Sequence, residues 1–305
     1  LANNLLLVIA TGAVLLGTLY PLIYEAMTGG KKISVGPPYF NAVFVPLMLV
    51  LFAFMSCSPV SRWKKTPMAF FTSQIVPLLG SLVVMTALVL VLASRFEISV
   101  VLINTLALWI LLSLMRDFWS KVAHKVRKVP ALFQQSMSYY GMLLGHLGIA
   151  VAVIGVCTTV YYSEEKDLRM VPGDVVSLSG YDFRFNTVRQ IQGPNYKADQ
   201  GEMDIFRNDK LIVTLFPEKR FYQTGGNVMT EADIDPSLFR DLFVALGEPI
   251  GDDAWAVRVH YKPFVRWIWF GGLLIGLGGV ITVFDRRYRA VSRARQASRL
   301  EGALV

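Results

Sequence analysis

The stretch SYYGMLLGHLGIAVAVIGVCTTVYY, which runs from Ser138 to Tyr162, decides the fold. It contains no Asp, Glu, Lys or Arg, and it is long enough to cross a bilayer, which takes about 20 apolar residues. Its one ionisable side chain of consequence is His146, which lies 18 residues after Lys128 and 18 residues before Glu164. An ionisable group near the middle of an apolar span is energetically costly and is therefore a candidate functional site.

The composition identifies an integral membrane protein. The chain has 305 residues, of which 54% are hydrophobic and 17% charged, against about 25% charged in soluble domains. The net charge of +8 is unevenly placed, because residues 163–262 hold 17 acidic and 12 basic residues and the remainder holds 5 and 18. Most of the latter bases flank apolar runs, which indicates membrane topology and contact with lipid rather than a nucleic-acid partner.

Hydropathy predicts an α-helical polytopic membrane protein with six transmembrane helices and an inserted small β-rich periplasmic domain. The spans are expected at about residues 3–24, 39–57, 73–93, 98–115, 139–162 and 264–284. The predicted division is a five-helix transmembrane region over residues 1–162, a β-rich domain over 163–262, and a final helix with a basic cytoplasmic tail over 263–305.

The basic residues predict the orientation of these spans. If the spans alternate, 14 Lys and Arg residues fall on one side, in the loops 58–72 and 116–135 and in the tail after Phe284. They are Arg62, Lys64, Lys65, Arg116, Lys121, Lys125, Arg127, Lys128, Arg286, Arg287, Arg289, Arg293, Arg295 and Arg299. Because basic loops stay in the cytoplasm, residues 163–262 are expected in the periplasm of a bacterium, outside its inner membrane.

Short alternating apolar runs predict strands in this domain. The runs are residues 175–178, 181–185, 203–206, 211–216 and 254–260, and Asn208-Asp209 is typical of a hairpin turn. Residues 237–246 are expected to form a short helix. The many carboxylates indicate a solvated face, with a docking surface for a protein partner as the alternative.

Small residues on the span 139–162 form one stripe, which favours the close approach of another helix. They are Gly141, Gly145, Gly148, Ala152 and Gly155. At 100° per residue, His146 points roughly 140° away from the centre of this stripe. Three roles remain open for it: a neutral histidine bonded to a neighbour, part of a proton relay, or a haem ligand. A relay usually needs further intramembrane Asp, Glu or His residues, and none is expected in the other spans.

Two outer segments are candidates for a ligand rim. Gly36, Pro37 and Pro38 predict a stiff turn between the first two spans, which acts either as a cap or as part of a rim. In the last span, Trp267 is expected at the membrane interface beside Arg266. The same span contains Gly272 and Gly276 as a GxxxG pair extended by Gly279, which permits close helix packing. His260, just before it, is expected to be structural, with a ligand role as the alternative.

Three segments resemble the CcmF family, which belongs to the cytochrome c maturation haem lyase and has NrfE-type lyases as close relatives. They are SVGPPYFN at residues 34–41, GHLGIAVAVIG at 145–155 and YKPFVRWIWFGG at 261–272. The order of spans, domain, final span and basic tail is similar as well. The resemblance covers essentially the whole chain but only the C-terminal half of a CcmF-like protein. Since the chain starts with Leu1, it is expected to be a piece of a longer or split protein.

The resemblance implies handling of haem and its attachment to the CxxCH motif of apocytochrome c. It implies a CcmE-like haem chaperone and CcmH/CcmI-like proteins as partners. It also implies a haem b held by two transmembrane histidines, of which His146 matches the C-terminal one. The second ligand, a tryptophan-rich segment and two periplasmic histidines would lie N-terminal to Leu1, in the remaining CcmF-like half.

The expected site therefore consists of His146 as axial ligand of the haem iron, with a rim made by Pro37, Pro38, Tyr39, Arg266 and Trp267. No residue is a credible general acid or base, so whether this chain alone is an enzyme stays open. Two functions of other classes remain as alternatives: half of a transporter or permease, and a scaffold that docks assembly partners. A transporter predicts broken helices or several charges at the midplane, and the sequence shows neither.

Overall fold

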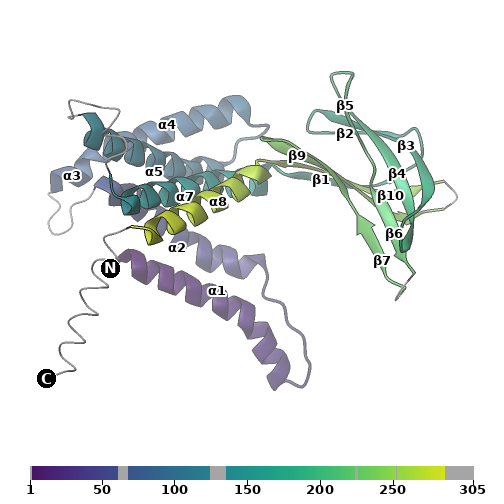
Figure 1. The fold of residues 1–305 in the computed structure, drawn as a ribbon, viewed down its shortest axis with the longest axis horizontal. Coiled ribbons are helices and arrows are strands. Elements are labelled where there is room, and N and C mark those ends of the chain that lie inside the picture. The colour runs from purple at the N-terminus through teal and green to yellow at the C-terminus, as the bar shows by residue number, and fades with distance from the viewer. Residues whose placement is uncertain (1, 61–67, 124–134, 224–225, 252, 286–305) are drawn as a thin grey trace. The chain divides into compact units, whose positions relative to one another are not determined.

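The computed structural model describes residues 2–60, 68–123, 135–223, 226–251 and 253–285. They belong to two compact units, Leu1–Val153 with Phe270–Val305, and Ile154–Trp269. The first unit holds most of the helices and the second holds all the described strands (Figure 1). The predicted fold class, a polytopic helical protein with an inserted β-rich domain, is confirmed.

Six helices are long and apolar enough to cross a membrane, as predicted. They are α1 (Ala2–Met27), α2 (Pro37–Cys57), α4 (Ile75–Leu92), α5 (Ile98–Ala123), α7 (Met137–Tyr162) and α8 (Val265–Val283), with a 3-10 turn η1 (Ser58–Val60) and the short α3 (Met68–Ser73) between them. The predicted end of the fourth span, Met115, is wrong, because α5 continues to Ala123. This extension brings Asp117 inside a helix and buries it.

Local chemistry explains where α2 begins and how it meets α1. Gly36 is the N-cap, and Pro37 and Pro38 occupy the first turn, where a missing backbone N–H does no harm. Tyr39 then donates its hydroxyl to the Ala13 carbonyl at 2.9 Å. A Cβ added to Gly17 would come within 2.6 Å of the Tyr39 ring, so the glycine is what lets the two helices approach.

The orientation prediction depends largely on basic residues that lie outside the described part of the chain. These are Arg62, Lys64, Lys65, Lys125, Arg127, Lys128 and the six arginines of the tail. Arg116 and Lys121 are described, and both lie near the C-terminal end of α5.

Two antiparallel sheets build the second unit. One has the order β1-β10-β9-β8, and the other has the order β2-β3-β4-β6-β7 with β5 paired to β4. The strands are β1 (Glu164–Met170), β2 (Val175–Leu178), β3 (Tyr181–Gln192), β4 (Tyr196–Arg207), β5 (Lys210–Leu215), β6 (Glu218–Tyr222), β7 (Val228–Glu231), β8 (Asp233–Pro236), β9 (Arg240–Pro249) and β10 (Trp255–Pro263). Figure 1 shows that these strands are strongly curled.

This core combines both sheets. Phe183 and Phe185 from β3, Ile205 from β4, and Leu242 and Val259 from the other sheet all lie in it and are almost completely buried. Each comes from a strand in which inward and outward side chains alternate, as the period of two requires.

The predicted helix over residues 237–246 is wrong. Most of this stretch is β9, which pairs with β10 on one side and with β8 on the other. Leu242, Val244 and Leu246 are fully buried at every second position, which is the pattern of a strand with one face in a core. Asn208-Asp209, by contrast, forms the predicted two-residue hairpin turn between β4 and β5, with φ values of 51° and 59°.

Candidate functional site

Helix α7 is held to α8 through glycines spaced seven residues apart. An added Cβ at Gly148 would lie 2.6 Å from the Gly271 carbonyl oxygen, and one at Gly278 would lie 2.6 Å from the Gly141 carbonyl oxygen. An added Cβ at Gly155 would lie 2.8 Å from the Ile268 backbone nitrogen. Backbone therefore meets backbone along this contact, which we call the α7–α8 seam: Gly141, Gly148 and Gly155 of α7 with Gly271 and Gly278 of α8.

The seam confirms the predicted stripe on α7 and corrects the one on α8. Gly272, Gly276 and Gly279 have open space beside their Cα atoms within the described chain. The contact uses Gly271 and Gly278 instead, which lie on another side of the helix. A GxxxG spacing shows that close packing is possible on a face, but it does not select the face that a neighbour takes.

His146 lies on α7, partly buried, and its ring orientation is fixed by its own helix. Its Nδ1 lies 2.9 Å from the Met142 carbonyl oxygen, one turn earlier. Because a carbonyl oxygen can only accept, Nδ1 carries the proton in this hydrogen bond. In the neutral ring Nε2 then carries the lone pair, which is the form that ligates a metal.

The predicted rim residues of α2 are engaged with their neighbours. Pro37 and Pro38 form the first turn of α2. The Tyr39 hydroxyl donates a hydrogen bond to the Ala13 carbonyl oxygen, and the Tyr39 ring packs edge-on against Phe40. Their observed contacts are those of the cap between two helices, which was one of the two predicted roles.

Arg266 and Trp267 follow a sharp turn from β10 into α8. Phe264 forms this turn with φ of 59°, a strained value for an aromatic residue. Its N–H donates to the Phe239 carbonyl at 3.0 Å, and its ring centroid lies 5.0 Å from that of Trp267. Arg266 is exposed, whereas the indole N–H of Trp267 is buried without a partner among the described residues.

His260 lies in β10 and has the structural surroundings predicted for it. Its ring meets Phe243 edge-on at 4.8 Å between centroids, and its Nδ1 lies 3.4 Å from a Glu165 carboxylate oxygen. Burial lowers the pKa of His260, and the nearby positive charge of Lys262 lowers it further. Only 7% of His260 is exposed.

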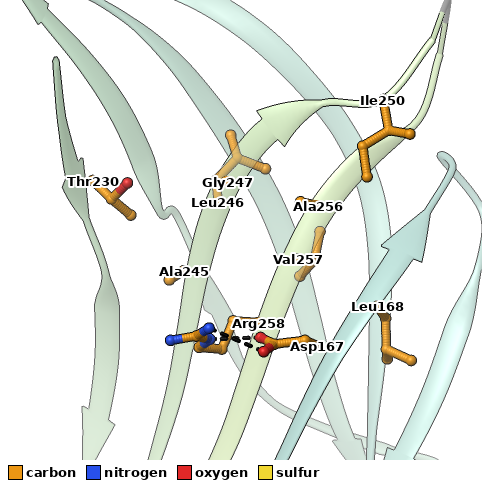
Figure 2. Close-up of a pocket in the computed structure, with 10 residues that line it drawn as sticks. All are labelled: Asp167, Leu168, Thr230, Ala245, Leu246, Gly247, Ile250, Ala256, Val257 and Arg258. Carbon is orange, nitrogen blue, oxygen red and sulfur yellow. Dashed lines mark hydrogen bonds and ion pairs between the residues drawn. The ribbon is translucent and has the colours of Figure 1, made fainter.

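A hollow of about 550 Å³ opens between β1, β7, β9 and β10 (Figure 2). Its charged lining residues include Asp167 and Arg258. Arg258 donates hydrogen bonds to the Asp167 carboxylate through Nε at 2.5 Å and Nη2 at 2.9 Å, and its Nε also lies 3.2 Å from a Glu165 carboxylate oxygen. The hydrogen bond from Arg258 lowers the pKa of Asp167. Across the described residues, no cluster of His, Cys, Asp and Glu could hold a metal ion. The guanidinium of Arg258 at this hollow is thus shared between the carboxylates of Asp167 and Glu165.

One buried polar cluster in the helices was not predicted. Asp117 of α5 accepts hydrogen bonds from the Tyr139 hydroxyl at 2.7 Å and from Lys121 Nζ at 2.9 Å. Asp117 lies beyond Met115, the predicted end of the fourth span, in the part of α5 that continues to Ala123. The spacing of four residues from Ser113 to Asp117 to Lys121 on one helix face could have indicated the extension.

Comparison with known proteins shows which proteins share this sequence and fold. A family profile described as the CcmF C-terminal beta-sandwich matches residues 161–263. The cytochrome c-type biogenesis protein CcmF of Pseudomonas aeruginosa is 48% identical over 304 residues, 99% of this chain and 46% of the relative. That of Escherichia coli K12 is 39% identical over 290 residues, 95% and 44% of the two chains. This chain matches roughly the C-terminal half of CcmF-family proteins.

The match covers one part of the family's proteins. The chain spans about half the length of the curated relatives it matches. A solved structure of "Cytochrome c Heme Lyase CcmF" has the same fold, with a TM-score of 0.67 at 18% identity over 93% of this chain and 45% of that one. The three segments that resemble the CcmF family lie at the start of α2, within α7, and across the end of β10 and the start of α8, and the family profile covers the β unit.

Proposed function

We propose that this chain is part of a cytochrome c haem lyase, which handles haem and attaches it to apocytochrome c at the periplasmic face of a bacterial inner membrane. His146 is proposed as one axial ligand of a b-type haem. The observation that carries the assignment is the hydrogen bond from His146 Nδ1 to the Met142 carbonyl. It leaves Nε2 with a lone pair and fixes the plane in which that lone pair points.

The residues around His146 fit such a group. The seam glycines contact α8 on a side of α7 away from His146. The contact between the two helices therefore does not occupy the His146 side chain. The neighbouring turns supply Met142, Leu143 and Ile149, which are the apolar surroundings that a porphyrin prefers. When bound, the haem would supply electron transfer, which the family resemblance links to keeping delivered haem ferrous. The second axial ligand would come from the remaining CcmF-like half.

The proposed rim residues would contact the haem at the outer end of its site. The buried indole N–H of Trp267 lacks a partner among the described residues and is therefore available as a donor. The exposed guanidinium of Arg266 suits a carboxylate such as a haem propionate. Pro37, Pro38 and Tyr39 would shape the rim through the α2 cap. The CcmE-like chaperone, the CcmH/CcmI-like proteins and apocytochrome c are proposed as partners at this side.

The test is the absorption spectrum of the purified full-length protein. His146→Ala is expected to lose the bis-imidazole haem spectrum while the protein keeps its elution volume and helical content. His260→Gln is the matched control and is expected to keep the spectrum. Imidazole added to His146→Gly should restore it, since the free base can enter the space of the lost ring. An unchanged spectrum in His146→Ala would overturn the ligand assignment.

Topology needs its own test. Protease added to the outer side of sealed spheroplasts is expected to cut within the β unit, and cutting only from the cytoplasmic side would reverse the proposed orientation. Because this result does not depend on haem, the location and the ligand can fail separately.

A further inference from the structure

The turn that connects β8 to β9 carries two large apolar side chains at its tip. The Ser237 N–H donates a hydrogen bond to the Arg240 carbonyl at 2.8 Å. This bond closes a two-residue turn that consists of Leu238 and Phe239, which are 59% and 55% exposed. Turns of this length favour Asn, Asp and Gly, so the apolar tip requires an explanation outside the turn itself.

The same β unit contains a turn of the usual composition. Asn208 and Asp209 connect β4 to β5, and both are polar and exposed. The two turns have the same length and belong to one folded unit, so their local backbone requirements are similar. Their opposite composition therefore indicates different surroundings, with water around Asn208 and Asp209 and an apolar medium around Leu238 and Phe239.

The β8–β9 turn contacts the residues at which α8 begins. The Phe264 N–H donates to the Phe239 carbonyl at 3.0 Å. The Phe239 ring centroid lies 5.7 Å from that of Phe264 and 6.4 Å from that of Trp267. The exposed apolar surface of the turn is thus continuous with aromatic side chains at the start of a membrane-spanning helix.

The length of α8 fixes the depth of this contact. Helix α8 has 19 residues, which span about 28 Å at 1.5 Å per residue, and the hydrocarbon core of a bilayer is about 30 Å thick. The helix therefore needs its whole length to cross, and its first residue, Val265, lies at the edge of the hydrocarbon. Phe264 and its partner Phe239 lie at the same level.

The polar groups beside the tip have partners within the β unit. The Ser237 N–H and the Phe239 carbonyl are both hydrogen-bonded. The guanidinium of Arg240 forms an ion pair with Asp235 and donates to the Tyr181 hydroxyl at 3.2 Å, and its side chain is only 14% exposed. Entry of the tip into lipid would therefore leave neither these backbone groups nor this charge without a partner.

We propose that the β8–β9 turn is a membrane anchor, which inserts Leu238 and Phe239 into the lipid leaflet on the side where the β unit lies. Apolar side chains of interfacial segments enter the boundary between headgroups and acyl chains by about 5–10 Å. The anchor attaches the β unit to lipid by a contact additional to the helices α7 and α8. It involves no haem, so it is independent of the function proposed for His146.

Spin labels in the full-length protein test the anchor. In a cysteine-free background, Leu238→Cys is labelled with a nitroxide, and the protein is placed in lipid nanodiscs. Leu211→Cys is the matched control, because Leu211 is also an exposed leucine, at 49%, but lies next to the polar Asn208-Asp209 turn. Molecular oxygen concentrates in lipid, whereas a neutral nickel chelate stays in water. The ratio of oxygen to nickel accessibility should be at least about threefold higher at Leu238→Cys, for a label at the depth of an interfacial segment.

Two results of this experiment would overturn the proposal. Equal ratios at the two positions would place the turn in water. Low accessibility of Leu238→Cys to both oxygen and nickel would mean that protein covers the turn, either the remaining CcmF-like half or a partner.

The unmodified protein supplies a measurement that needs no substitution. A phospholipid with a photoactivatable diazirine in its acyl chain is incorporated into the nanodiscs, and cross-linked peptides are identified by mass spectrometry. Cross-links are expected on peptides from α8 and on the peptide that contains Leu238 and Phe239, but not on the peptide that contains Leu211. Cross-links on α8 without any on the β8–β9 turn would show that the turn does not enter the bilayer, and the proposal would be wrong.

Discussion

The α7–α8 seam and the core of the β unit are two interiors built on opposite principles. In the seam, glycine backbones touch, and an added Cβ at Gly148 would lie 2.6 Å from an oxygen of α8. In the β unit, large side chains such as Phe183 and Leu242 are fully buried and fill the space between the sheets. One interior is defined by the absence of side chains and the other by their volume.

The difference follows from the surroundings. A soluble domain gains free energy when apolar side chains leave water. Helices in lipid have no such gain, because acyl chains are as apolar as leucine, and their association depends on close backbone approach. Hence the β core should be most sensitive to the loss of atoms, and the seam should be most sensitive to their addition.

The largest effect is expected in the β core. Leu242→Ala should lower the free energy of opening of the β unit by about 3–4 kcal/mol, through lost burial and the cavity left behind. Hydrogen–deuterium exchange of the β9 and β10 amides measures this. Ile234→Ala, at a position 46% exposed on β8, is the control and should change the free energy by less than about 1 kcal/mol. Equal losses in the two variants would contradict a core centred on Leu242.

The same substitution in the seam and beside it should have opposite signs. Gly148→Ala forces a methyl group against the Gly271 carbonyl and should destabilise the helices by about 2 kcal/mol. Gly272→Ala has open space and should stabilise α8 by up to about 1 kcal/mol, because glycine is a poor helix former. The melting temperatures of the two variants in one detergent should therefore move in opposite directions. A fall of equal size in both would show that the two glycine faces are equivalent.

A polar contact between the same two helical segments should matter less. Asp285, just after α8, accepts hydrogen bonds from Ser138 N–H at 2.9 Å and Ser138 Oγ at 2.6 Å at the start of α7. Asp285→Asn removes a negative charge from a helix N-terminus and should cost about 1 kcal/mol. Faster hydrogen exchange in the first turn of α7 is the measurement. Ser138→Ala keeps the backbone bond and should show a smaller change, whereas a larger change would mean that the hydroxyl is the main contact.

Hydropathy was sufficient to predict the six long helices, because a span of 18 or more apolar residues is a local property of sequence. Alternation predicted β2, β5 and most of β10, and only part of β3 and of β4. The prediction failed for β9, because residues 237–246 were expected to form a helix although Leu242, Val244 and Leu246 are spaced two apart. Hydropathy failed to predict the end of α5, since the charged residues Asp117 and Lys121 resemble a loop until the partner Tyr139 is known.

The sequence was sufficient to predict which residue is the candidate ligand, but not the geometry around that residue. A lone histidine in an uncharged span marks a candidate from sequence alone. Its tautomer depends on the distance to the Met142 carbonyl, and the side of α8 that meets α7 depends on which glycines another helix selects. The buried contact between Asp117 and Tyr139 likewise depends on a second helix, which spacing along one segment does not contain.

The smallest effect concerns the buried histidine of the β unit, which makes its stability depend on pH. Burial keeps the pKa of His260 below its ordinary value of 6.5, so the unfolded chain binds a proton more readily than the folded one. Stability is therefore complete above pH 6.5 and declines as the pH falls below it. Hydrogen exchange of the β10 amides at pH 7.5 and 5.5, corrected for intrinsic rates, measures the decline. Asp167 does not contribute in this window, because its pKa is lowered from 3.8. His260→Gln should remove the decline, and a decline of the same size in that variant would assign it to another group.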